Sequence, residues 1–221
     1  TASMTYPANT IPNYAFKNPS ASVGKTLLTN VILPTTITSV GRAAFLYCNG
    51  LSDVEIPSSV LTIGRSSFNG CKKLKEVTFQ TNPQLTTVGY LSFAYCDSLV
   101  SFGIPSGVTI IDYGAFYLCD TLTNFNLPES LQSIGSYAFY SCKEITDFNI
   151  PATTTSIGQG AFIGVRGMVT VDDNNPNYSS LNGVLYDKAK TKLFYCPPTT
   201  TGDFAIPSTV KSIEVDAFFN C

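Results

Sequence analysis

A phenylalanine recurs at a nearly constant interval through most of this chain. Successive copies are separated by 23, 25, 23, 23 and 23 residues, and a final copy follows after a further 56; they are Phe45, Phe68, Phe93, Phe116, Phe139, Phe162 and Phe218. A period of about 20–50 residues is typical of solenoids, in which each structural unit contacts only its neighbours. The spacing therefore predicts one continuous, elongated array of stacked coils.

Other residue types keep fixed distances from each phenylalanine. A small residue directly precedes it, glycine stands four residues before it in five copies, and proline stands eleven before it in six. Between Leu51 and Ile56 apolar and polar residues alternate, which predicts a strand with one buried face that ends at Pro57. The glycine is expected to supply a permissive turn backbone, and the phenylalanine is expected to fill the interior of the coil.

The run LSDVEIPSSVLTIGRSSFNGC, residues 51–71, resembles the BspA-like branch of the leucine-rich repeats, and the resemblance extends over residues 27–221. The segment VDDNNPNYSSLNGVLYDKAKTKLFYCPP, residues 171–198, is similar to the hairpin unit that interrupts such arrays in bacterial members. The resemblance implies a cell-surface binding or adhesion protein without catalysis. We expect a leucine-rich-repeat-like right-handed solenoid, β-rich with short helical or 3-10 turns and interrupted by one β-hairpin insertion.

Four regions follow from these patterns. We expect an N-terminal cap at 1–26, the repeat array at 27–170, the hairpin insertion at 171–198 and a resumed, truncated repeat at 199–221. A two-residue insertion within 80–84, which contains a turn-forming Asn-Pro pair, lengthens one repeat. The chain begins at Thr1 rather than at methionine and ends in mid-unit at Cys221, so we expect a processed fragment of a longer protein.

The composition of the chain disfavours several classes of function. The net charge is −2 and only 13% of residues are charged, which provides no basic surface for nucleic acid. No run of about 18 apolar residues is present, so we expect no transmembrane helix. The chain has no histidine, and a Ser-His-Asp or Cys-His mechanism cannot be built in the usual way. We therefore expect no enzyme activity, no catalytic residue, no cofactor and no metal site.

A cysteine follows the phenylalanine by three residues at six of the seven repeats, at Cys48, Cys71, Cys96, Cys119, Cys142 and Cys221. In stacked coils these positions would repeat at about the 4.8 Å spacing of strands, within the ~4.4–6.8 Å that a disulfide spans between Cα atoms. Equivalent side chains of stacked coils nevertheless point in the same direction, and Val165 takes the position in the one remaining repeat, that of Phe162. We expect buried, reduced thiols, with a disulfide ladder as the alternative.

Polar residues between the buried strand positions predict two outward-facing columns. One column is Asn30, Asp53, Glu76, Ser101, Asn124 and Asp147, and the other is Ile32, Glu55, Thr78, Gly103, Asn126 and Asn149. The candidate ligand-binding residues are Asp53, Glu55, Glu76, Asn124, Asn126, Asp147 and Asn149. Close carboxylates can share a cation, or act as acid and base on a glycan. A solvated acidic patch is the simpler interpretation.

Three functions remain open. The resemblance favours a non-catalytic, cell-surface or secreted recognition or adhesion protein that binds a host protein, a matrix protein or a glycan through its repeat surface. A passive spacer that carries another domain is the alternative. A polysaccharide-cleaving enzyme that uses Asp53, Glu55 and Glu76 is the third. It would need a groove as deep as its substrate and at least one carboxyl group with a raised pKa. The expected location is extracellular or at the cell surface.

Overall fold

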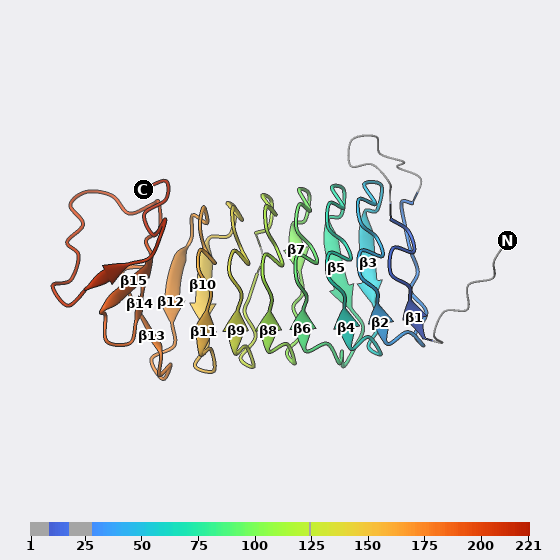
Figure 1. The fold of residues 1–221 in the computed structure, drawn as a ribbon, viewed down its shortest axis with the longest axis horizontal. Helices are drawn as coiled ribbons and strands as arrows, with labels where there is room; N and C mark the ends of the chain where they lie inside the picture. Colours follow the sequence, from blue (N-terminus) through green and yellow to red (C-terminus); the bar gives the residue numbers. More distant parts are fainter. Residues whose placement is uncertain (1–8, 18–27, 124) are drawn as a thin grey trace.

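The computed structural model describes residues 9–17, 28–123 and 125–221, which form a solenoid whose coils stack along one axis (Figure 1). Most of the predicted cap at 1–26, and the candidate Asn124, lie outside the described residues. Each full repeat makes one coil, and most of the described coils carry a strand on one side and a two-residue return strand on another. The predicted leucine-rich-repeat-like solenoid is confirmed.

One side of the solenoid, which we call the strand face, carries strands of two or four residues. Alternation along β3 buries Val54 and Ile56 and exposes Asp53 and Glu55, as the sequence predicts. The strands of this face run parallel, in sheets of order β3-β5-β7 and β10-β12. They are β3 (Asp53–Ile56), β5 (Glu76–Phe79), β7 (Ser101–Phe102), β10 (Asp147–Ile150) and β12 (Met168–Val171).

The return strands are two residues long and pair in parallel from coil to coil, in sheets of order β1-β2-β4 and β11-β9-β8-β6. They are β1 (Thr10–Ile11), β2 (Ser39–Val40), β4 (Thr62–Ile63), β6 (Thr87–Val88), β8 (Ile110–Ile111), β9 (Ser133–Ile134) and β11 (Ser156–Ile157). The repeated glycine comes directly after five of these strands, β2, β4, β6, β9 and β11. A Cβ atom on Gly89 would lie 2.4 Å from the carbonyl oxygen of Ile63 on the preceding coil.

That contact corrects the expected role of the repeated glycine. None of Gly41, Gly64, Gly89, Gly135 and Gly158 has a positive φ angle. These glycines therefore do not supply a left-handed turn. They allow the backbones of neighbouring coils to approach, and the Gly64 amide donates to the Val40 carbonyl at 2.8 Å.

The turn that carries the phenylalanine replaces the helical or 3-10 turns that the sequence suggested. Residues two before and two after the phenylalanine take positive φ angles, as at Leu91 (48°) and Tyr95 (58°) around Phe93. Left-handed residues interrupt a right-handed helical run, so the segment forms consecutive hydrogen-bonded turns. No helix occurs among the residues that the structure describes.

The phenylalanines form a continuous column in the core. The rings of Phe45, Phe68 and Phe93 are fully buried, and successive ring centroids are 4.9 and 5.2 Å apart. Phe16 extends the stack, 5.1 Å from Phe45. Phe102 packs edge-on against Phe93 from the strand-face side, at 4.9 Å. The predicted role of the repeated phenylalanine as core is confirmed.

An antiparallel unit stands where the sequence predicts a hairpin. Its strands are β13 (Tyr178–Leu181), β14 (Val184–Asp187) and β15 (Lys192–Tyr195); β16 (Ser212–Ile213) then pairs in parallel with β15. The predicted pair of strands is present, and β13 adds a third. The Tyr195 ring packs 5.9 Å from Phe162, and its hydroxyl donates to the Gly167 carbonyl at 2.7 Å. The unit thereby covers the Phe162 end of the phenylalanine column.

Candidate ligand-binding surface

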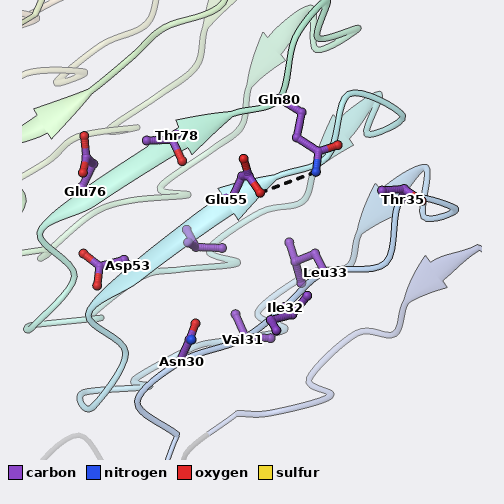
Figure 2. Close-up of a pocket in the computed structure, with 11 residues that line it drawn as sticks. Asn30, Val31, Ile32, Leu33, Thr35, Asp53, Glu55, Glu76, Thr78 and Gln80 are labelled. Carbon is purple, nitrogen blue, oxygen red and sulfur yellow. Dashed lines mark hydrogen bonds between the residues drawn. The ribbon is translucent and has the colours of Figure 1, made fainter.

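The structure brings three of the candidate residues together. Asp53 on β3 lies directly opposite Glu76 on β5, and Glu55 lies opposite Thr78. Asn30 forms a bridge with Asp53 on the other side. Asp53, Glu55 and Glu76 are exposed on the strand face, and we call them the acidic group (Figure 2). The parallel register of β3 and β5 thus places these carboxylates as the repeat predicts.

The remaining candidates lie apart from the acidic group. Asp147 and Asn149 are exposed on β10, opposite Met168 and Thr170 of β12. Asn126 is exposed on the coil that precedes β10, while Asn124 is outside the described residues. The strand β7 separates them from β5 (Figure 1). The predicted candidates therefore divide into two groups along the solenoid axis.

The three carboxylates of the acidic group line a surface hollow of about 330 Å³. Asn30, Ile32, Glu55 and Gln80 line it together with the other two carboxylates (Figure 2). The side chain of Ile32 is 88% exposed, so the hollow offers an apolar contact beside its charges. The Gln80 amide donates to Glu55 at 3.5 Å between Nε2 and Oε2, and the Ser52 hydroxyl donates to Asp53 at 2.7 Å.

A second hollow, of about 370 Å³, adjoins the first and shares Glu76, Thr78 and Gln80 with it. Pro83 and Gly103 are also among its lining residues. A Cβ atom on Gly103 would meet nothing within 4 Å, so this glycine leaves a gap in the outward column. Sequence reasoning did not identify Gln80, Pro83 or Gly103 as site residues. The 25-residue spacing of this one repeat was the available signal, because its insertion supplies Gln80 and Pro83.

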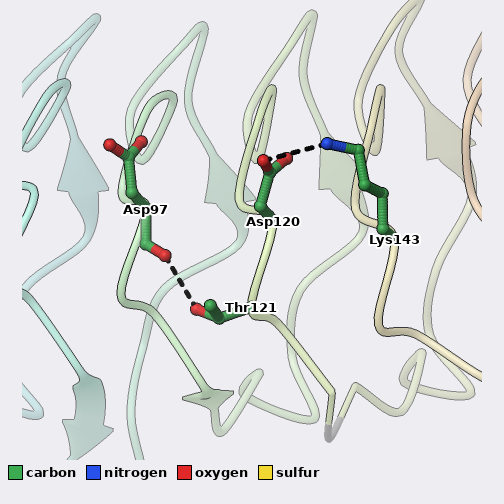
Figure 3. Close-up of polar contacts among 4 residues, drawn as sticks. All are labelled: Asp97, Asp120, Thr121 and Lys143. Atoms are coloured by element: carbon green, nitrogen blue, oxygen red, sulfur yellow. Dashed lines mark hydrogen bonds and ion pairs between the residues drawn. The ribbon is translucent and has the colours of Figure 1, made fainter.

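Charged residues elsewhere pair across coils. The residue after the cysteine position is Lys72, Asp97, Asp120 or Lys143 on four successive coils. Lys72 lies 3.3 Å from Asp97. Lys143 lies 3.0 Å from Asp120 (Figure 3). In contrast, no carboxylate of the acidic group forms an ion pair with any described residue. Its negative charge is therefore left for solvent or for a ligand.

The aligned cysteines are free thiols, as predicted, and no disulfide ladder forms. Five of the six aligned positions are buried, and Cys221 is exposed. The Cys119 thiol donates to the carbonyl oxygen of Phe93 at 3.1 Å. Burial raises the pKa of Cys48 to about 11 and raises that of Cys96 well above its ordinary value. Within the described ranges, no cluster of three or more His, Cys, Asp or Glu side chains is arranged to hold a metal ion.

Comparisons with known proteins agree with this geometry. Residues 2–96 match the BspA type leucine rich repeat region in six copies. The chain is similar to a leucine-rich repeat protein from Eubacterium ventriosum, with 31% identity and a TM-score of 0.70 over 78% of this chain and 46% of that one. It is also similar to a leucine rich cell surface protein from Faecalibacterium prausnitzii, with 27% identity and a TM-score of 0.65 over 96% of this chain and 61% of that one.

A leucine-rich repeat protein from Bacteroides ovatus has 28% identity and a TM-score of 0.61, over 72% of this chain and 39% of that one. The fold is thus that of a leucine-rich repeat solenoid. The predicted resemblance to the BspA-type repeats is confirmed, and the family match itself covers residues 2–96. It spans 39% to 61% of the lengths of the three structures named above.

A comparison with curated proteins finds no significant match. In the part of the chain that the structure describes, no helix has the length and apolar character needed to cross a membrane.

Proposed function

We propose that this chain is a non-catalytic recognition module, secreted or displayed at the cell surface, that binds an extracellular protein or glycan through its strand face. The pair of adjoining hollows around the acidic group carries this proposal. The description of the Faecalibacterium prausnitzii protein as a cell surface protein supports the location. A host protein, a matrix protein and a glycan are the ligand classes to test.

The strand face combines the features that a binding surface needs. Stacked coils present an extended surface, and its outward residues differ from coil to coil while the core residues repeat. The exposed Ile32 lies beside unpaired carboxylates, which suits a ligand that carries cationic groups next to an apolar one. A passive spacer would have no need of unpaired charges at a hollow, and it would bind no ligand saturably.

The test is a screen of the purified chain against panels of extracellular matrix proteins and glycans, followed by titration of each hit. The triple variant Asp53→Ala, Glu55→Ala, Glu76→Ala is expected to weaken binding at least about tenfold, because it removes all three charges of the hollow. The matched control replaces Glu129, Asp173 and Asp203, which are exposed elsewhere, and is expected to bind like the natural sequence. Thermal unfolding checks that both variants fold.

Two outcomes would contradict the proposal. Unchanged affinity in the acidic-group variant would move the site away from this hollow, with the hairpin unit as the next surface to test. A complete absence of saturable ligands would favour the spacer function.

A further inference from the structure

A second surface carries arginine and tyrosine side chains on the turns that follow the return strands. Arg42, Arg65, Tyr90 and Tyr113 occupy the same repeat position on four successive coils, three residues before the phenylalanine, and we call them the Arg–Tyr ridge. The Arg65 guanidinium lies 4.1 Å from the centroid of the Tyr90 ring, and that ring stacks on Tyr113 at 4.9 Å. These contacts order Arg65, Tyr90 and Tyr113 in one row before any partner arrives, while the Arg42 guanidinium lies 6.0 Å from the Tyr14 ring centroid.

The two arginines of the ridge lack a counter-charge. Arg42 and Arg65 are both exposed, and neither forms an ion pair with any described residue. Their coils are in direct contact, because the Ala43 amide donates to the Arg65 carbonyl at 2.8 Å. Like charges on neighbouring coils repel each other, and a bound carboxylate partner would relieve that repulsion.

The strand face also carries charges without a counter-charge, and these charges are negative. Asp53 and Glu76 lie directly opposite each other on adjacent strands and have no cationic partner among described residues. Both charge pairs sit on neighbouring coils of one solenoid, so both repeat at the strand spacing of about 4.8 Å. Guanidinium groups bind carboxylates through two parallel hydrogen bonds. The hollow of about 330 Å³ beside Asp53 and Glu76 gives room for arginine side chains.

We infer that a second copy of this chain docks its strand face on the Arg–Tyr ridge, with Asp53 and Glu76 of one copy against Arg42 and Arg65 of the other. Tyrosine and arginine are enriched at protein interfaces, where they contribute most of the binding energy. The contact joins two different surfaces, so each copy keeps one free partner surface and copies can add side by side. Self-association does not depend on the proposed function, although it competes with any ligand of the acidic group.

Sedimentation velocity over a range of concentrations tests this contact. The natural chain is expected to associate in about 50 mM salt and to dissociate as salt rises to about 500 mM, because exposed charges are screened. The variants Arg42→Glu/Arg65→Glu and Asp53→Lys/Glu76→Lys are each expected to weaken association at least about tenfold. An equimolar mixture of the two is expected to associate again, since the intact ridge of one variant meets the intact strand face of the other.

The control Arg166→Glu/Lys211→Glu makes the same change in charge at exposed positions away from both surfaces and is expected to associate like the natural chain. Circular dichroism establishes that each variant folds. The neutral pairs Arg42→Gln/Arg65→Gln and Asp53→Asn/Glu76→Gln replace the charge reversal of the same surface if that variant does not fold. A natural chain that stays monomeric at every concentration overturns the inference. So does a mixture of the two charge-reversed variants that remains monomeric.

The ridge variant also separates the two proposals. Arg42→Glu/Arg65→Glu leaves the acidic group intact, so it is expected to keep any ligand of the strand face while it loses self-association. Loss of ligand binding in this folded variant would show that the ridge, and not the strand face alone, holds the ligand.

Discussion

At the scale of single residues, the cysteine position shows how one side chain joins two coils. The Cys96 thiol donates to the carbonyl oxygen of Phe68 on the preceding coil, at 3.3 Å. Val165 fills the equivalent position without a donor and is fully buried. The sequence predicted this burial because valine and cysteine share the position. It did not predict the hydrogen bond, because the neighbouring carbonyl comes from a different coil.

Burial of these thiols makes stability depend on alkaline pH. The pKa of Cys48 is raised by burial to about 11, from a value near 9.0 that the unfolded chain retains. Its stabilising contribution is therefore complete below pH 9 and is lost as pH rises towards the folded pKa. Each buried thiol of the column is expected to steepen the loss by up to about 1.4 kcal/mol per pH unit.

The variant Cys96→Val tests this dependence. Urea unfolding at intervals between about pH 8 and pH 10.5 is expected to show a shallower decline in the free energy of unfolding than the natural chain shows, because one titrating group is gone. At about pH 8 the two chains are expected to differ by less than about 1.5 kcal/mol, since the substitution conserves apolar volume. Identical slopes would show that the column thiols do not titrate on unfolding.

At the scale of the structural element, the turn around the phenylalanine limits what the sequence could predict. Alternation and period were enough to locate the strands and the register of Asp53 with Glu76, because both follow directly from the repeat. The turn was predicted to be helical or 3-10. Leu91 and Tyr95 take left-handed angles, and neither residue type signals such angles in a sequence. The Arg–Tyr ridge was missed because ring stacking between coils depends on that turn geometry.

Two glycines give a matched test of coil approach. Gly89→Ala is expected to lower the free energy of unfolding by about 1–3 kcal/mol, because its Cβ atom would lie 2.4 Å from a backbone carbonyl. Gly103→Ala, on the strand face, is expected to change stability by no more than about 0.5 kcal/mol, since nothing lies within 4 Å. Chemical denaturation of both variants provides the comparison. Equal effects would mean that backbone approach is not why glycine stands at position 89.

At the scale of the whole molecule, burial is unequal along the axis. One buried apolar cluster runs from Ile11 to Tyr195, while a smaller separate cluster joins β14 and β15 to the last coil. Ile213 of β16 is 47% exposed, whereas the equivalent Ile63 of β4 is 4% exposed. The sequence could not predict this difference, because both residues stand at the same repeat position.

Hydrogen exchange is expected to follow this inequality. Backbone amides of residues 207–221 are expected to exchange faster than those of β5 to β9, because local opening of the last coil exposes little additional apolar surface. Exchange measured by mass spectrometry on proteolytic peptides resolves the two regions. Uniform protection along the chain would show that the solenoid opens as one cooperative unit.

The hydrogen bonds between coils also have a consequence for how such a protein can change over generations. The Phe45 amide donates to the Ser67 carbonyl, and two coils further along the Phe93 amide donates to the Ala115 carbonyl in the same way. Because this interface is alike from pair to pair, unequal recombination between repeats of the gene can duplicate or delete a whole coil and still leave matching partners on either side. The length of such a molecule can therefore change between generations by whole coils.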